Sequence, residues 1–531
     1  MTDVLIDGES LTPEEIEAVA RHGATVGLSE EASEKIRASR ERIEAILEDD
    51  EAVYGVNTGF GDLVSERIPK EDLETLQENL VRSHASGAGP ELDREVVRAM
   101  MLARVNTLAK GYSGIRESVV ETLVTMLNEG VHPVVRSRGS LGASGDLAPL
   151  AHMALVLLGE GQANVADDPP ASGSGDRLPG DDALATAGLE PLALRAKEGL
   201  ALINGTQLTV GIGALAVVDA ERTLRAADAA GALTTEVTMS TTANCDPKIH
   251  EVRPHEGQAA SARNVRRLTA DSGIVESHRN CDRIQDAYSI RCLPQVHGAA
   301  RDAIDHLREA VEVELNSATD NPLVFPADGI DDRASGTANA AVLSGGNFHG
   351  APLAHRLDYA VAALTDLASI CERRVDRLLN PHIQEPHLEP FLANHGGLES
   401  GYMIAQYTAA ALVNELRSTG RTGTDSTPVS GNQEDHVSMS ANAALEARRA
   451  ADAAATVVGI ELLSATRALE FVDDDLEPGA GTGAVATAVQ AALPEEDGDR
   501  PLHEPIDDAT AMVLGGLIEE RTNAALEDEL E

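Results

Sequence analysis

Apolar side chains recur at helical spacing over long stretches in the middle of the chain. One stripe runs from Ala300 to Leu315 at intervals of three and four residues, and a second runs from Leu353 to Leu378 in the same way. A third, alanine-rich stretch covers about 436–471. Such spacing is typical of amphipathic helices, and a helix of ~30 residues spans ~45 Å. We therefore expect a bundle of long, nearly antiparallel helices.

Shorter helices with clear ends are predicted near the start of the chain. Thr12, Pro13 and Glu15 form the pattern of a capping box, in which Thr12 is the N-cap and proline takes the first helical position. Gly23 should end this helix, and a second helix should begin after Ser29.

Several segments are too rich in glycine, proline or polar residues for regular helix, and we predict loops there. No alternation of strands and helices is visible along the chain, so a mostly α protein is expected. The predicted loops are 54–63, 138–150, 166–181 and 473–502, the last as a loop-rich connection before a final helix.

Charge narrows the range of partners. The 531 residues include 88 acidic and 42 basic side chains, for a formal charge of -46, and only five of the cations are lysines. This balance argues against nucleic acid or an anionic membrane as a partner, because phosphate groups require clustered cations. Acid excess with little lysine also suggests adaptation to high salt, where screening removes self-repulsion.

Other features exclude further classes. The four cysteines have no metal-type spacing, and no segment resembles a signal peptide or a membrane span, so a cytoplasmic protein is expected. His382 and His387 could suggest a metal site. However, the prolines in this segment would break a helix, and no pattern of carboxylate or cysteine ligands accompanies the two histidines. The glycines of 479–483 do not complete a dinucleotide-binding motif. We expect neither a metal nor an external cofactor.

The segment Gly142-Ala-Ser-Gly-Asp146 is the strongest candidate for chemistry. A serine-hydrolase elbow would need glycine where Asp146 stands, and it would need a strand-to-helix turn in a parallel sheet. Ala-Ser-Gly can instead cyclise on itself: the amide nitrogen of Gly145 attacks the carbonyl of Ala143 if the backbone bends tightly. Loss of water from the ring and from Ser144 leaves a methylidene-imidazolone electrophile (MIO). Elimination of ammonia from an α-amino acid whose β-proton is not acidic requires such a group.

In this segment the chain resembles the aromatic amino acid ammonia-lyases, which form MIO from Ala-Ser-Gly. Other segments are similar to the histidine branch of that family, and the resemblance runs from about residue 10 to 471. The matching segments are RGSLGASGDLAPLAH (138–152), YGVNTGFG (54–61), LVRSHASGAG (80–89), EGLALINGTQ (198–207), QDAYSIRCLPQVHG (285–298), NSATDNPL (316–323), SGGNFHG (344–350) and SGNQEDHVSM (430–439). The acidic loop at 166–181, the scarcity of lysine and the acidic tail depart from the family pattern outside these motifs.

The resemblance implies a fold and an organisation. The bundle would be of the fumarase/aspartase-like type. An N-terminal MIO-bearing region would cover 1–200, the long-helix bundle 201–471, and a loop-rich and helical segment 472–531. The assembly would be a homotetramer whose active sites take residues from more than one subunit.

Roles follow from the resemblance, residue by residue. Ala143, Ser144 and Gly145 would become MIO, and Asp146 would assist the cyclisation. Tyr54 would remove the β-proton as a phenolate. Tyr288 would line the pocket or stabilise the amine adduct, although it could be the base instead. The substrate-binding residues would be Arg291 for the carboxylate, Asn204 and Gln285 for the MIO carbonyl and polar substrate atoms, Phe348 near MIO, and His84 with Glu434 for an imidazole ring.

The expected reaction is the conversion of L-histidine to trans-urocanate and ammonia, the first step of histidine breakdown. A phenylalanine or tyrosine ammonia-lyase or an aminomutase is the nearest alternative, but it would need an apolar or phenol-binding pocket near His84 and Glu434. A fumarase-like lyase without MIO would leave Ala-Ser-Gly idle. A non-catalytic scaffold would have no reason to keep the tyrosines together with Arg291.

Overall fold

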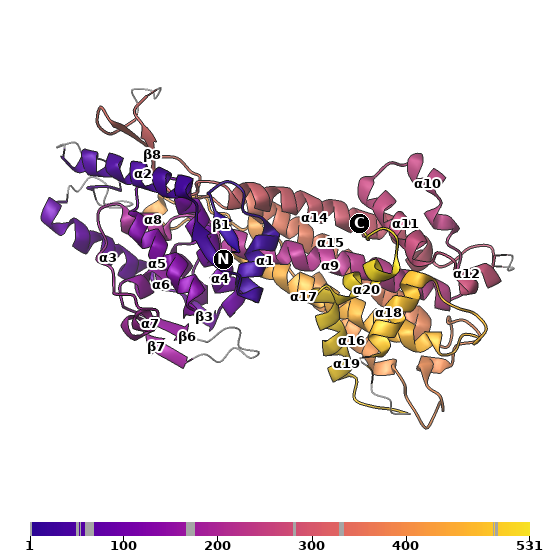
Figure 1. The fold of residues 1–531 in the computed structure, drawn as a ribbon. Helices are drawn as coiled ribbons and strands as arrows, with labels where there is room; N and C mark the ends of the chain where they lie inside the picture. The colour runs from indigo at the N-terminus through magenta and orange to yellow at the C-terminus, as the bar shows by residue number, and fades with distance from the viewer. Residues whose placement is uncertain are drawn as a thin grey trace. The chain divides into compact units, whose positions relative to one another are not determined.

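The computed structural model describes residues 3–48, 53, 55–58, 68–165, 176–279, 283–328, 334–491, 493 and 498–531. The chain packs into two compact units, each made of three separate stretches (Figure 1). The first unit contains 1–216, 307–358 and 421–445, and the second contains 217–306, 359–420 and 446–531. The three consecutive regions expected from the sequence stay a prediction.

Four long helices belong to both units because each continues from one into the other. They are α9 (Gln207–Val237), α14 (Leu293–Leu315), α15 (Ala351–Leu379) and α17 (Ser440–Leu469). The last three confirm the helices predicted from the apolar stripes. The sequence did not single out α9, because this helix is buried on nearly all sides and so shows almost no polar face.

The short helices of the first unit include the predicted capping box. The Oγ1 of Thr12 accepts from the Glu15 amide at 3.2 Å, the Glu15 carboxylate accepts from the Thr12 amide at 3.0 Å, and Gly23 ends the helix at φ 70°. The eight helices are α1 (Pro13–His22), α2 (Glu30–Glu48), α3 (Leu73–His84), α4 (Arg94–Ala109), α5 (Glu117–Asn128), α6 (Leu147–Leu157), α7 (Gly180–Thr186) and α8 (Glu198–Ile203).

Strands are few and short in the described chain. The parallel pair is β1 (Val4–Ile6) with β2 (Val26–Leu28). The antiparallel sets are β3 (Ala88–Glu91) with β5 (Arg136–Arg138), β4 (Val131–Pro133) with β6 (Gln162–Val165) and β7 (Asp176–Pro179), and β8 (Leu323–Pro326) with β9 (Ala340–Leu343).

The second unit adds short helices around the long ones. They are α10 (Pro247–Glu251), α11 (Glu256–Leu268), α12 (Gly273–Ser277), α13 (Tyr288–Arg291), α16 (Met403–Ser418), α18 (Ala480–Gln490), α19 (His503–Leu514) and α20 (Leu517–Ala525). Isolated 3-10 turns lie at Lys70–Asp72 in the first unit, Ala243–Cys245 and Pro390–Leu392 in the second, and Thr422–Thr424 and Ser430–Asn432 in the first.

Three predicted loops were partly wrong. In 138–150 the last four residues already belong to α6, which begins at Leu147. In 166–181 the end of the segment forms β7 and the start of α7, because 176–179 pairs with β6; 166–175 lies outside the described residues. In 473–502 the Gly-rich stretch forms α18, whose Gly481 packs against Leu268, where a Cβ atom would approach within 2.8 Å. Close helix packing explains these glycines, and two helices rather than one follow them. None of the helices in the described residues is long and apolar enough to cross a membrane.

A buried histidine makes the stability of the fold depend on pH. The His132 ring in β4 is 3 % exposed, and its Nε2 accepts a hydrogen bond from the Arg98 guanidinium at 2.9 Å. Burial, together with the neighbouring Arg98 charge, lowers the pKa of His132 from 6.5 to about 3. The unfolded chain therefore takes up a proton below pH 6.5, whereas the folded chain does not until about pH 3.

We accordingly expect the free energy of unfolding to fall by ~1.4 kcal/mol per pH unit from this residue as the pH drops from 6.5. His132→Gln keeps an acceptor for Arg98 but removes the titration. Denaturant unfolding at pH 7 and pH 5, at constant high salt, should show a flatter pH dependence for the variant than for the parent chain. Equal slopes would mean that folding does not lower the pKa of His132.

Candidate active site around the Ala-Ser-Gly loop

The loop that carries Ala143-Ser144-Gly145 is bent between two glycines. Gly142 has φ 63° and Gly145 has φ 77°, values that residues with a Cβ atom rarely adopt. A Cβ on Gly145 would lie 2.2 Å from the Gly205 carbonyl oxygen, and one on Gly142 would lie 2.2 Å from Ser438 Oγ. Glycine is therefore required at both ends of the bend.

Two loops from distant parts of the sequence hold this bend in the first unit. The Gly142 carbonyl accepts from the Gly350 amide at 3.2 Å and from Ser438 Oγ at 2.9 Å. The Met439 amide donates to the Leu141 carbonyl at 2.8 Å. The segments 344–350 and 430–439, both noted in the sequence, thus meet at the start of the Ala-Ser-Gly tripeptide.

The turn between α8 and α9 supports the other side of the tripeptide. Nδ2 of Asn204 donates to the Ser144 carbonyl oxygen at 2.7 Å, and the Asp146 amide donates to the Gly205 carbonyl at 2.7 Å. Among the described residues, no hydrogen bond occupies the Gly145 amide, the nitrogen that ring closure requires. The backbone is therefore held on both sides of the tripeptide.

Asp146 is fully buried beneath the loop. Its carboxylate accepts from Ser140 Oγ at 2.6 Å, from the Thr209 amide at 2.9 Å and from Thr209 Oγ1 at 3.1 Å. Burial raises the pKa of Asp146 above its ordinary value, against the lowering effect of these hydrogen bonds. A carboxyl group with a raised pKa can exchange a proton with its neighbours more readily than an exposed one.

Glu434 and Phe348 lie on the two loops that hold the bend. The Ser144 hydroxyl donates to Glu434 Oε1 at 3.0 Å, so this half-buried carboxylate faces the central residue of the tripeptide. Phe348 is also half-buried, two residues before Gly350. The structure therefore brings Glu434 and Asn204 into direct contact with Ser144, and it places Phe348 on an adjoining loop.

His84 ends α3 and is half-buried. Its Nδ1 lies 2.8 Å from the Leu80 carbonyl oxygen and 3.1 Å from Ser83 Oγ. Helix α3 packs against α6, which begins next to Asp146, and against α8, which ends next to Asn204. His84 thus belongs to the helices around the loop, and the two contacts of its ring described above are with residues of its own helix.

Three further predicted residues belong to the second unit. Gln285, Tyr288 and Arg291 are all exposed, and Tyr288 reaches 72 % exposure. Tyr54 lies outside the described residues; its neighbour Gly55 has φ 73°, and a Cβ there would lie 2.8 Å from Pro322 Cδ.

The sequence analysis missed the residues whose hydrogen bonds support the Ala-Ser-Gly loop, Asp146 and the Asn204 turn. Arg104 in α4 is fully buried and donates to the Asn204 carbonyl at 2.9 Å and to the Ala201 carbonyl at 3.1 Å. Burial lowers the pKa of Arg104 to about 10, so it remains a cation next to the Asn204 turn. Its position between apolar residues on either side, Ala103 and Val105, was the available signal. For Ser140, Thr209 and Ser438 no comparable signal exists.

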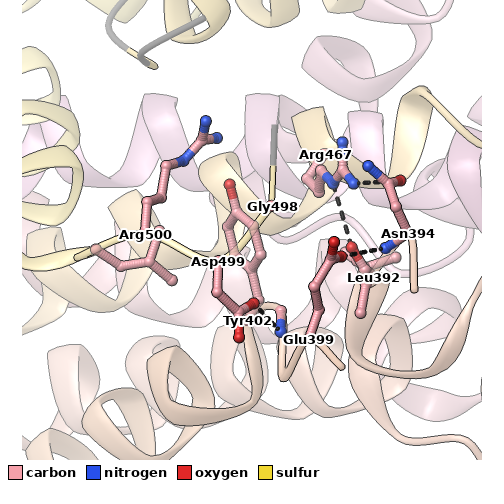
Figure 2. Close-up of a pocket in the computed structure, with 11 residues that line it drawn as sticks. Leu392, Asn394, Glu399, Tyr402, Arg467, Gly498, Asp499 and Arg500 are labelled. Carbon is pink, nitrogen blue, oxygen red and sulfur yellow. Dashed lines mark hydrogen bonds between the residues drawn. The ribbon is translucent and has the colours of Figure 1, made fainter. Parts of the chain in front are cut away.

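A pocket of the second unit is lined by polar groups that hold the local backbone together (Figure 2). Glu399 accepts from the Asn394 amide at 2.9 Å, Asp499 accepts from the Gly401 amide at 2.8 Å, and Arg467 donates to the Leu392 carbonyl at 3.2 Å. These groups join two turns of the chain.

Comparisons with known proteins show the family of the chain. Residues 11–491 match the sequence profile of the family described as aromatic amino acid lyase. The chain is 63 % identical to a probable histidine ammonia-lyase of Halobacterium salinarum, over 99 % of this chain and 98 % of the relative. It is 48 % identical to the histidine ammonia-lyase of Gloeobacter violaceus, over 99 % and 98 %.

Solved structures show the same fold. Histidine ammonia-lyase from Trypanosoma cruzi superposes with a TM-score of 0.89 at 39 % identity, covering 99 % of this chain and 96 % of that one. Tyrosine aminomutase from Streptomyces globisporus gives 0.90 at 37 %, covering 99 % and 100 %. The mostly α fold predicted from the sequence is confirmed.

Proposed function

The chain belongs to the aromatic amino acid lyase family, and on that premise we propose that it removes ammonia from L-histidine to give trans-urocanate. The observation that carries this proposal is the similarity to histidine ammonia-lyases over almost the entire chain. The arrangement around Ser144 supports it, because Glu434 lies beside the reactive tripeptide, where an imidazole N–H would need an acceptor. The reaction is the first step of histidine degradation.

The tripeptide has the features that formation of MIO requires. Both flanking glycines bend the backbone, the Gly145 amide is not engaged within the described residues, and Asn204 donates to the Ser144 carbonyl oxygen. MIO would supply an electrophile that no ordinary side chain offers. Asn204 would stabilise negative charge on the carbonyl oxygen that it already contacts. Asp146 would handle a proton during ring closure, and no external cofactor is needed.

The remaining residues would bind and orient the substrate. Arg291 would hold the carboxylate with its planar guanidinium, and Gln285 would hydrogen-bond polar substrate atoms. His84 and Glu434 would satisfy the imidazole ring, with Phe348 packing nearby. A tyrosine, Tyr54 or Tyr288, would remove the β-proton.

We also propose a homotetramer with active sites shared between subunits. Large apolar and aromatic side chains on the bundle are exposed in the isolated chain, which is typical of surfaces that another subunit covers. They include Ile284 and Tyr288 ahead of α14, Val313 in α14, Tyr359 in α15, and Ile404 and Tyr407 in α16.

The test of the proposed reaction is a direct assay. The purified protein, in high salt, is given L-histidine, L-phenylalanine or L-tyrosine, and the absorbance of the unsaturated product is followed. We expect urocanate from histidine and little product from the other two. Preferential production of cinnamate, of coumarate or of a β-amino acid would assign the chain to another branch of the family.

Selectivity for imidazole should depend on Glu434. If Glu434 accepts the ring N–H, its removal leaves that group unsatisfied, at about 1–3 kcal/mol, or about 5- to 150-fold in kcat/KM. Glu434→Ala should lose this much with histidine and much less with any residual phenylalanine turnover. His84→Leu should act in the same direction.

Asp435→Asn is the matched control, because this neighbouring carboxylate is exposed and in the same loop. Intact mass of each variant shows whether MIO has still formed. Equal losses on both substrates, with MIO present, would show that Glu434 serves catalysis rather than recognition.

A further inference from the structure

The segment 283–292 of the second unit has two distinct sides. Its outer side carries Gln285, Tyr288 and Arg291, three of the residues assigned to substrate or chemistry, and all are exposed. Its inner side carries Asp286 and Ile290, which are 9 % and 1 % exposed. The segment therefore presents functional side chains outward from a buried base.

Hydrogen bonds within the segment and with residues 241 and 244 fix that base. Asp286 accepts from the Thr241 amide at 3.0 Å and from Arg283 Nη1 at 3.1 Å. Nδ2 of Asn244 donates to the Ile290 carbonyl at 3.1 Å and to the Arg291 carbonyl at 3.2 Å. The backbone on either side of Tyr288 is thus held by polar contacts.

A fully buried arginine adds a contact from inside the bundle. Arg374 of α15 donates from Nη1 to the Ser289 carbonyl oxygen at 3.2 Å, next to Tyr288. Its other nitrogens bind Glu461 of α17 in a two-point pair, Nε to Oε1 at 2.5 Å and Nη2 to Oε2 at 2.9 Å. The Glu461 pair fixes the plane of the guanidinium, and the plane aims Nη1 at Ser289.

A histidine fixes the same guanidinium from a second direction. Nε2 of His297 in α14 lies 3.2 Å from both Nη1 and Nη2 of Arg374, and its Nδ1 lies 2.8 Å from Asp228 Oδ1 in α9. With the proton on Nδ1, the ring donates to Asp228 and accepts from Arg374. Arg301 donates to the other Asp228 oxygen at 2.9 Å.

Stability alone does not explain why charged residues fill this part of the helical core. Two arginines face two carboxylates around a buried histidine, and apolar residues of similar volume are often at least as stabilising as buried ion pairs. Within the cluster, Arg374 also reaches the backbone of a segment that carries functional residues. Its guanidinium therefore has a geometric use beyond charge pairing.

We propose that Arg374 is a positioning residue, which sets the backbone of α13 so that Tyr288 and Arg291 meet the substrate in the correct orientation. The inference rests on the roles proposed for these two residues. Glu461 and His297 act through Arg374 by holding its guanidinium in plane. None of the three touches the substrate.

Arg374→Lys tests the proposal. Lysine keeps the charge opposite Glu461, so the fold is not left with an unpaired buried carboxylate, but its single nitrogen cannot also donate to Ser289 with the same geometry. We expect kcat/KM for histidine to fall about 100-fold, through both a higher KM and a lower kcat, because small misplacements of reacting groups have effects of this size.

Arg98→Lys is the matched control in the first unit. Arg98 is also buried, donates to the Val19 and Leu127 carbonyls and contacts the ring of His132, and none of these three partners is a proposed site residue. Both variants should unfold at a lower temperature, and only Arg374→Lys should change the kinetic constants. Similar kinetic losses in both variants would reduce Arg374 to a stabilising residue and overturn the proposal.

Hydrogen exchange gives a readout that does not depend on the reaction. The amides of Ile290, Arg291 and Cys292 bond to carbonyls within the same short segment. The amides of a peptide covering 284–292 should exchange at least about tenfold faster in Arg374→Lys than in the parent chain. Their exchange rate in Arg98→Lys should equal that of the parent chain. Unchanged exchange in Arg374→Lys would refute the positioning role. Failure of the histidine assay alone, with the exchange difference present, would instead refute the proposed substrate.

Discussion

Ser144→Ala is expected to abolish turnover of histidine while leaving the fold intact. Alanine has no hydroxyl to lose, so the electrophile cannot form, and we expect activity to fall by at least about 10³-fold, equivalent to ~4 kcal/mol in the barrier. In the unmodified chain, this hydroxyl donates to Glu434 among the described residues. Its removal should cost the unmodified fold only about 1 kcal/mol of stability.

Intact mass separates this effect from misfolding. The parent chain should be lighter than its sequence by two water molecules. Ser144→Ala should not lose the water that comes from the Ser144 hydroxyl, and it should have no MIO reactivity. Ser137→Ala, a serine of β5 outside the tripeptide, should match the parent in mass and in rate. A fully active parent with an unmodified mass would eliminate MIO from the mechanism.

Low salt should remove both assembly and activity. Each chain carries a formal charge of -46, so a tetramer would gather about four times that charge in one particle. At ~0.1 M salt the screening length is ~10 Å and carboxylates on adjoining subunits repel, whereas at ~1 M it is ~3 Å and they scarcely interact. If active sites are shared between subunits, urocanate production should fall together with particle size.

Sedimentation and activity should therefore be measured in parallel from multimolar to millimolar salt. A non-ionic osmolyte at matched osmolality is the control, because it does not shorten the screening length and should not restore the tetramer. An intact, fully active tetramer at the lowest salt would show that the acidic residues have no role in assembly. An active monomer at any salt would refute the shared sites.

Local signals explain which parts of the fold could be predicted. The capping box of α1 involves residues three positions apart, so its hydrogen bonds follow from the sequence directly. The apolar stripes of α14 and α15 can be recognised in the sequence because each helix also has a polar face. By contrast, α9 has almost no polar face, and the sequence pattern therefore overlooked it. The glycines of α18 serve close packing, so composition alone misassigned this helix as a loop.

The site shows the same limit. Ala143, Ser144, Gly145 and Asp146 were recognisable because their chemistry depends on adjacent residues. The contacts of Gly142 with Gly350 and Ser438 join positions hundreds of residues apart, and no local pattern encodes them. Arg374 was invisible for the same reason, since its partners Ser289 and Glu461 come from other elements.

The interleaving of the two units has a consequence for biosynthesis. The first unit takes its final stretch from 421–445, and the second takes its own from 446–531. During translation, neither unit can be completed until most of the chain has left the ribosome. The apolar faces of α9, α14 and α15 leave the ribosome before α17 and stay exposed until α17 has been synthesised. Folding that depends on such distant contacts is slow and prone to aggregation. The nascent chain should therefore be a demanding chaperone client, and truncation before α17 should yield two incomplete units rather than one finished domain.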